Sequence, residues 1–263
     1  MQYINCEEYA AEILETVRQI PDKKKLVIIT AGDDPASKSY VKGKLKDCAF
    51  CEVPCEHIVM SEDADENDLG MEVVKGNCDD EVGGIIVQLP LPKGWDEKFL
   101  STRALAHKDV DGFRNDSLFK PCTPEGIVHL LKHELGDLTG KTALVVGRGR
   151  LVGEPCAKML IDEDCTVTVA HSKTINLDEE LSRHHDIVVS AVGKANFLDL
   201  CKCDADIVID AGVNRNEQGK LCGDCYNFDA TKFTNMKVTP VPKGIGLMTR
   251  AMLMKHMGDA ACM

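Results

Sequence analysis

A glycine-rich turn between a short apolar run and an amphipathic segment is the first stretch whose residue types could do chemistry. Residues 144–146 are Leu-Val-Val, glycines follow at 147, 149 and 153, and apolar residues recur at helical spacing over 151–161. Glycines let the backbone approach a pyrophosphate, and a helix N-terminus offers unpaired N–H groups and a positive dipole end. The spacing G-x-G-x-x-x-G is one residue longer than the usual dinucleotide fingerprint, so an ordinary tight strand-to-helix turn is the alternative interpretation. The cofactor-binding residues predicted in this turn are Gly147, Arg148, Gly149, Val152 and Gly153.

The residues after the next strand indicate which dinucleotide this turn would bind. In NAD-binding folds an acid at the end of the second strand holds the ribose hydroxyls. Here a strand predicted over 165–170 is followed by His171, Ser172, Lys173 and Thr174, without an acid. A hydroxyl, an imidazole and an ammonium suit a 2′-phosphate, and Arg148 adds a guanidinium. We therefore predict NADP rather than NAD, with His171, Ser172 and Thr174 in the site; a polar strand end without a ligand is the alternative.

Strands and helices alternate along the chain, which predicts an α/β fold with parallel sheets. The first series has strands at 25–30, 56–60 and 84–88 and helices at 5–19, 37–50 and 65–75. A helix at 124–135 precedes the second series, with strands at 142–147, 165–170, 186–191 and 206–211 and helices at 152–161 and 177–183. The predicted cofactor site also includes Ala191, Val192, Gly193 and Val213.

The two series predict two domains with a catalytic cleft between them. An N-terminal βαβ substrate domain comprises residues 1–122 plus 244–263, and a Rossmann-like dinucleotide-binding domain comprises residues 123–243. The final helix, over 247–257, is too little for a third domain, so we expect it to pack on the first. In parallel sheets ligands bind beyond the carboxyl ends of the strands. Residues 31–44 and 88–92 should therefore face one crevice.

Composition limits the partners and the location of the protein. The 263 residues carry a net charge of −12, which disfavours nucleic-acid binding because phosphate contacts need a basic face. The first residues lack the basic start and apolar core of a signal peptide, and no apolar run reaches membrane-spanning length. We expect a cytoplasmic protein with neither a nucleic acid nor a membrane as partner.

Thirteen cysteines are many for a chain of this length. Cys48-x-x-Cys51 and Cys222-x-x-Cys225 resemble metal clips, but the two pairs are far apart and structural zinc sites usually bring ligand pairs close in sequence. The interpretation that we favour is reduced thiols, some of them buried as small apolar side chains, and no metal.

Several segments together resemble the bifunctional methylenetetrahydrofolate dehydrogenase/methenyltetrahydrofolate cyclohydrolase family. They run in the family's order over nearly the whole chain, and only the glycine turn is generic. The matching segments are 37–44 (SKSYVKGK), 87–92 (VQLPLP), 108–113 (KDVDGF), 121–124 (PCTP), 147–148 with 152–155 (GR, VGEP), 171–174 (HSKT), and 239–242 (TPVP) with Met248 and Thr249.

The resemblance implies a reaction and a set of residues. The family oxidises 5,10-methylenetetrahydrofolate with NADP and hydrolyses the methenyl product to 10-formyltetrahydrofolate. By resemblance Lys44 is the catalytic lysine, Tyr40 packs on the folate, Gln88 hydrogen-bonds near Lys44, and Asp111 anchors the pterin. Ser37, Leu89, Pro90 and Pro242 complete the implied substrate site. Tyr40 and Lys44 are four residues apart on a predicted helix and share one face, where an amine suits proton transfer; taken alone, the pair would be an ordinary solvated face.

Two departures from the family leave the strength of the dehydrogenase open. The family usually has serine at the position of Gly149, and a glycine-rich segment where this chain has Lys243 after Pro242. The leading hypothesis is the bifunctional NADP enzyme. A cyclohydrolase with a weak or lost dehydrogenase is the second, and a non-catalytic nucleotide-sensing protein is the third. The family is generally dimeric through its dinucleotide domain, which implies a homodimer.

Overall fold

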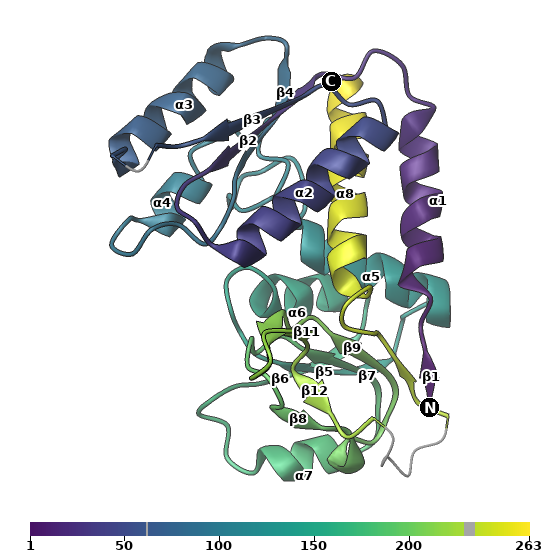
Figure 1. Cartoon of the computed structure of the whole chain (residues 1–263). Coiled ribbons are helices and arrows are strands. Elements are labelled where there is room, and N and C mark those ends of the chain that lie inside the picture. Colours follow the sequence, from purple (N-terminus) through teal and green to yellow (C-terminus); the bar gives the residue numbers. More distant parts are fainter. Residues whose placement is uncertain (62, 229–234) are drawn as a thin grey trace. The chain divides into compact units, whose positions relative to one another are not determined.

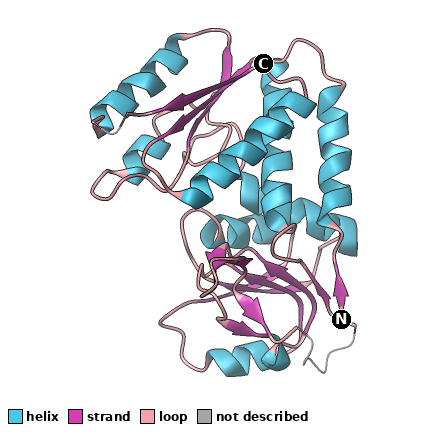
Figure 2. Cartoon of the chain, in the orientation of Figure 1, coloured by secondary structure: helices cyan, strands magenta, loops and turns pink. Residues whose placement is uncertain are grey.

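The computed structural model describes residues 1–61, 63–228 and 235–263, and the chain folds into two compact units (Figure 1). The three-stranded unit comprises Ala11–Cys122 and Arg250–Met263. The six-stranded unit comprises Met1–Ala10 and Thr123–Thr249. In each unit strands are flanked by helices, as the colours of Figure 2 show, and the predicted two-domain α/β architecture is confirmed.

The three-stranded unit is a parallel sheet in the order β3-β2-β4. Its elements are most of α1 (Cys6–Arg18), β2 (Lys25–Thr30), α2 (Pro35–Phe50), β3 (Cys55–Val59), α3 (Glu66–Cys78), β4 (Val82–Val87), α4 (Glu97–Ser101) and the greater part of α8 (Ile245–Ala261). Strands β2 and β4 are buried on both faces, as expected for parallel strands covered by helices. Alternate residues of β2 therefore face two separate apolar layers.

One layer packs Leu26 and Ile28 of β2 against α2 and α8, whose Met252 and Met257 are fully buried. The other layer packs Val27 and Ile29 against α3 and α4. The final helix thus contributes Met252 and Met257 to the core of the three-stranded unit. The first turn of α2 is fixed by Asp34, whose side chain accepts a hydrogen bond from the Ser37 N–H at 2.7 Å. Pro35, the first helical residue, follows it in the chain.

The six-stranded unit has a parallel sheet in the order β1-β13-β9-β7-β5-β6. Its main strands are β5 (Thr142–Val146), β6 (Thr166–Ala170), β7 (His185–Ser190) and β9 (Ala205–Asp210). Its helices are α5 (Cys122–Leu135), α6 (Gly153–Asp162), α7 (Leu177–Ser182) and the short 3-10 helix η1 (Leu200–Lys202). Two short strands, β1 (Gln2–Tyr3) and β13 (Lys237–Val238), complete this sheet. Two separate pairs of two-residue strands lie outside it: β8 (Leu198–Asp199) with β12 (Cys225–Tyr226), and β10 (Asn214–Arg215) with β11 (Leu221–Cys222).

The units differ from the predicted domains at both ends of the chain. Residues 1–10 belong to the six-stranded unit because β1 pairs with β13, Gln2 opposite Lys237 and Tyr3 opposite Val238. Residues 244–249 also belong there, so α8 begins in one unit and continues in the other. Among the described residues, no helix is long and apolar enough to cross a membrane.

Candidate active site and dinucleotide site

A buried lysine on α2 is the centre of the three-stranded unit's candidate site. Lys44 is 3% exposed, and its Nζ lies 3.9 Å from Asp111 Oδ1 and 5.4 Å from the centre of the Tyr40 ring. A distance of 3.9 Å is an ion-pair contact and too long for a hydrogen bond. Buried charges are usually paired, and here the partners are a carboxylate and the face of a tyrosine. The structure therefore brings Tyr40, Lys44 and Asp111 together, as the helix spacing predicted for the first two.

The turn after β4 lies against the start of α2. The Leu89 carbonyl accepts hydrogen bonds from Gln88 Nε2 at 2.8 Å and from Ser37 Oγ at 3.2 Å, and the Leu89–Pro90 peptide bond is cis. The Gln88 Oε1 atom is buried and accepts no hydrogen bond from the described residues. Buried acceptors are rarely left in this state, so Gln88 presents an oxygen suited to a donor.

The loop that carries Asp111 is anchored by neighbouring residues of the segment 108–113, to which the sequence assigned no individual role. Lys108 Nζ donates to three backbone carbonyls at the end of α3, at 2.7 to 3.0 Å, and burial lowers its pKa. Asp109 accepts the Arg114 N–H at 2.8 Å, and burial raises the pKa of its carboxyl. Gly112 has φ +72°, and a Cβ there would lie 2.4 Å from the Lys120 carbonyl oxygen. The Lys-Asp-Val-Asp-Gly sequence thus fixes the position of Asp111 through its neighbours.

A second buried ion pair lies one turn along α2 and was also missed. Arg250 Nε of α8 is 2.7 Å from Asp47 Oδ2, and burial raises the pKa of the Asp47 carboxyl while Arg250 opposes that shift. A Cβ at Gly43 would lie 2.0 Å from Arg250 Nη1. Glycine in the middle of a helix usually has a packing reason, and here it makes room for the guanidinium. That glycine was the available signal in the sequence.

Two of the three glycines in the turn after β5 are required by close packing. Gly147 has φ +113°, and its Cβ would lie 2.2 Å from the Ala191 carbonyl oxygen. A Cβ at Gly153, the first residue of α6, would lie 2.3 Å from the Gly147 carbonyl oxygen. At Gly149 a Cβ would meet no atom of the described residues within 4 Å, so none of them requires a glycine here. Val152, which precedes α6, forms no side-chain cap, and the Glu154 N–H donates to the Gly149 carbonyl at 3.1 Å.

The residues that follow β6, which are predicted to bind a phosphate, form a tight turn. The Thr174 hydroxyl accepts the His171 N–H at 2.9 Å, and His171 Nδ1 accepts the Lys173 N–H at 3.1 Å. These bonds close a tight turn that leaves Ser172 exposed. Arg148 is exposed as well, and within the described part of the chain it forms no ion pair with Glu154. Strand β6 borders β5, so its end lies beside the glycine turn.

The remaining predicted cofactor residues follow β7 and β9, on the other side of β5. The segment Ala191–Gly193 follows β7, and Val213, 60% exposed, follows β9. A fully buried acid that the sequence analysis missed, Asp224, accepts hydrogen bonds from this region. Pro242 lies in the six-stranded unit after a cis peptide bond, and Lys243 beside it has φ +75° and an ion pair with Glu7 at 3.1 Å. The participation of Pro242 in a substrate site stays a prediction.

The two-unit α/β fold is that of a dinucleotide-binding enzyme. Residues 4–111 match the catalytic domain of the tetrahydrofolate dehydrogenase/cyclohydrolase family, and residues 121–263 match the NAD(P)-binding domain of that family. The bifunctional protein FolD of Bacillus cereus is 42% identical over 270 residues, which cover 97% of this chain and 93% of that protein.

Two solved structures show the same fold over the whole length. The bifunctional FolD enzyme of Campylobacter jejuni is 34% identical with a TM-score of 0.92, covering 100% of this chain and 99% of that one. FolD of Trypanosoma brucei, in complex with NADP and an inhibitor, is 28% identical with a TM-score of 0.90, covering 99% and 97%. This chain belongs to the tetrahydrofolate dehydrogenase/cyclohydrolase family.

Proposed function

We propose that the protein oxidises 5,10-methylenetetrahydrofolate to the methenyl form with NADP and hydrolyses that form to 10-formyltetrahydrofolate. The observation that carries the proposal is the Lys44 centre, a nearly inaccessible amine between Tyr40 and Asp111. A solvated helix face would not bury a lysine in this way. The family membership supplies the reaction, and the arrangement of the site supports it.

The hydrolytic step needs two protons removed and one delivered. Water adds its oxygen to the methenyl carbon and loses one proton. The bond from that carbon to N5 then breaks while the hydroxyl oxygen forms the formyl C=O and loses its proton, and N5 gains a proton, so that one proton is released overall. Lys44 is the residue placed to accept and return such a proton. Gln88 offers a buried oxygen at which a donor can be held, and Tyr40 offers a flat face for the folate ring. Asp111 accepts from the amide and amine of the pterin.

The residues of the six-stranded unit fit NADP. Gly147 and Gly153 allow a close-packed turn, Val152 forms no side-chain cap at the start of α6, and the positive dipole end of that helix suits the pyrophosphate. Arg148, Ser172 and His171 would hold the 2′-phosphate, since no acid follows β6. Ala191, Val192, Gly193 and Val213 would contact the rest of the dinucleotide. When bound, the nicotinamide supplies the hydride acceptor, so the protein needs only to orient it against the methylene carbon.

We also propose a homodimer formed through the six-stranded unit. Strand β6 is an edge strand of the described sheet, and the large apolar side chains of Ile161, Val169 and Ile175 are 57%, 40% and 84% exposed. Exposed edges and apolar side chains are features of surfaces that pair. Sedimentation should give twice the chain mass for the parent protein and the monomer mass for Ile161→Asp. A monomeric parent would contradict the proposal.

A cytoplasmic location, without a nucleic acid or a membrane as partner, completes the proposal. The net charge of −12 supports the first exclusion. All thirteen cysteines carry free thiols, and Cys51, Cys156 and Cys203 are fully buried. Buried thiols among apolar residues are consistent with a reducing compartment.

Reduction of NADP in the presence of methylenetetrahydrofolate tests the main proposal. The absorbance of NADPH and of the methenyl product should both rise, and the methenyl signal should then decay without further cofactor. Decay of added methenyltetrahydrofolate without any NADP reduction would favour the weak-dehydrogenase alternative, which Gly149 motivates through its missing hydroxyl. If neither the NADPH signal nor the decay of the methenyl form is observed, only the nucleotide-sensing alternative remains.

A further inference from the structure

A single buried carboxylate in the six-stranded unit collects five hydrogen bonds. Asp224 is 0% exposed. Its donors are the N–H groups of Val192 at 2.8 Å, Gly193 at 3.1 Å and Lys194 at 2.9 Å, the hydroxyl of Ser190 at 3.1 Å, and the side-chain amide of Asn214 at 2.9 Å. Three successive N–H groups on one carboxylate form a nest, a geometry in which the backbone dipoles stabilise a negative charge.

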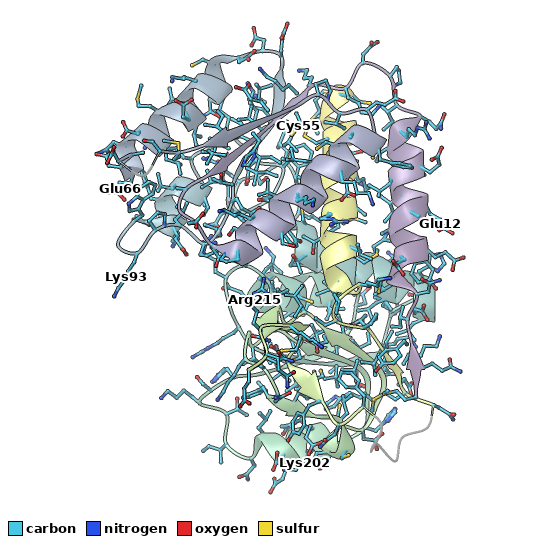
Figure 3. The ribbon with its side chains drawn as sticks, viewed as in Figure 1. Glu12, Cys55, Glu66, Lys93, Lys202 and Arg215 are labelled. Atoms are coloured by element: carbon cyan, nitrogen blue, oxygen red, sulfur yellow. The ribbon has the colours of Figure 1, made fainter. Side chains whose placement is uncertain are left out.

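One of these donors, Ser190, is the last residue of β7, and the other four lie in segments that follow the carboxyl ends of two neighbouring strands. Residues 191–194 follow β7, and Asn214, next to Arg215 labelled in Figure 3, follows β9. Both loops lie on the side of β5 away from β6. The loop after β7 also meets the glycine turn, because the Ala191 carbonyl lies where a Cβ of Gly147 would be. One acid therefore ties together the loops that border the predicted dinucleotide site.

The surrounding backbone is shaped to hold this acid in place. The Asp224 N–H donates to Asp210 Oδ1 at 2.9 Å, and Asp210 also accepts the N–H groups of Gly212 and Cys225 at 2.9 Å each. A Cβ at Gly212 would lie 2.2 Å from Asp224 Oδ1, and one at Gly223 would lie 1.9 Å from Asp210 Oδ2. Asp210 therefore fixes the position of Asp224, and Asp224 in turn fixes the loops.

We propose that Asp224 is a positioning residue for the NADP site, which holds the loops after β7 and β9 in the conformation that receives the dinucleotide. The inference rests on the proposed function. A carboxylate is needed because it only accepts hydrogen bonds, whereas an amide would turn N–H groups toward N–H groups on one side. The residues predicted to bind the 2′-phosphate follow β6, whereas the loops that Asp224 holds follow β7 and β9, on the other side of β5. Asp224 should therefore affect the binding of NAD and NADP alike.

Asp224→Asn tests the proposal with three measurements on one variant. The dissociation constant of NADP should rise at least tenfold, and that of NAD by a similar factor. Hydrogen exchange of the amides of residues 192–194, measured without cofactor, should accelerate at least tenfold, while the amides of β6 keep their rates. Hydrolysis of methenyltetrahydrofolate should stay within twofold of the parent rate, since Lys44 belongs to the three-stranded unit.

Asp186→Asn is the matched control. Asp186 also accepts a backbone N–H, that of Thr142 at 2.7 Å, but it lies at the amino end of β7 and outside both predicted sites. The control should change none of the three readouts. If Asp224→Asn does not fold, Asn214→Ala, which removes one donor, should weaken NADP binding several-fold and speed exchange in the same loop.

A failure of the proposed role of Asp224 and a failure of the proposed NADP-dependent function give different results. Unchanged NADP binding in folded Asp224→Asn overturns the inference, and so does an equal loss of hydrolysis and cofactor binding with a lower melting temperature. If the parent protein does not bind NADP at all, the proposed function fails. The exchange measurement then still decides whether Asp224 holds the loops.

Discussion

Replacing Arg148 with alanine should weaken NADP binding and leave NAD binding almost unchanged. Arg148 lies in the turn between β5 and α6, its side chain is exposed, and among the described residues it forms no ion pair with Glu154. The substitution therefore removes a guanidinium without breaking a contact that holds the turn. The melting temperature should stay the same.

The size of the effect follows from the contact that would be lost. A charge-assisted hydrogen bond between a guanidinium and a phosphate contributes about 1.5–3 kcal/mol. That corresponds to a rise of about 10- to 160-fold in the NADP Michaelis constant if binding is near equilibrium. Because Arg148 is exposed, the ratio of the variant's NADP Michaelis constant to that of the parent should fall as salt is added. The Debye length falls from about 10 Å at 0.1 M to about 3 Å at 1 M, so the lost charge interaction is screened more strongly.

Michaelis constants for NADP and NAD, measured at two salt concentrations, test this expectation. Arg183→Ala is the matched control, because Arg183 is an exposed arginine of the same unit that pairs with Glu180 at 2.8 Å. Equal losses for both cofactors would refute the reasoning, as would a fall in melting temperature. Either result would mean that Arg148 supports the turn and does not bind a phosphate.

Two further predictions concern the cofactor turn and the pH dependence of stability. Gly149→Ser should fold normally, because a Cβ there meets nothing within 4 Å, and its hydroxyl should lower the NADP Michaelis constant by about 2- to 10-fold; a raised constant would contradict this. Burial raises the pKa of Glu134, but hydrogen bonds from Lys237 and Tyr9, both at 2.7 Å, outweigh it and hold the pKa below its ordinary value of 4.5. The stability that this lowered pKa contributes is fully present above pH 4.5 and is lost as the pH falls through the lowered pKa. The urea midpoint of unfolding of Glu134→Gln should therefore be lower than that of the parent at pH 7 and equal to it at low pH.

Much of the fold could be predicted because local pattern and tertiary structure agree. Each predicted helix and each long strand is confirmed, with small shifts at the ends. Strands β2 and β5 are apolar runs between turn residues, and α2 begins at an aspartate followed by proline. The shared face of Tyr40 and Lys44 follows from helical spacing alone.

The rest depends on contacts between residues that are distant in sequence. The two-residue strands, such as β1 and β13, have no periodicity, and they form only because a neighbouring strand presents its backbone groups. This pairing is what shifts residues 1–10 into the six-stranded unit. Asp224 stands alone in a loop, and nothing local indicates that five donors from the end of β7 and from the segments after β7 and β9 meet it. The Asp47–Arg250 pair joins two helices from opposite ends of the chain, and only Gly43 hinted at it.

Hydrolysis of methenyltetrahydrofolate by Lys44→Met, without NADP, is the measurement that tests the central claim most directly. Methionine keeps the length of the side chain and removes the amine, so the folded state should survive. General acid–base groups contribute about 10²- to 10⁴-fold, so the rate should fall by about that factor. Lys46→Met, an exposed lysine on the same helix, should keep the parent rate. A folded Lys44→Met variant that hydrolyses the methenyl form at a near-parent rate would contradict the account.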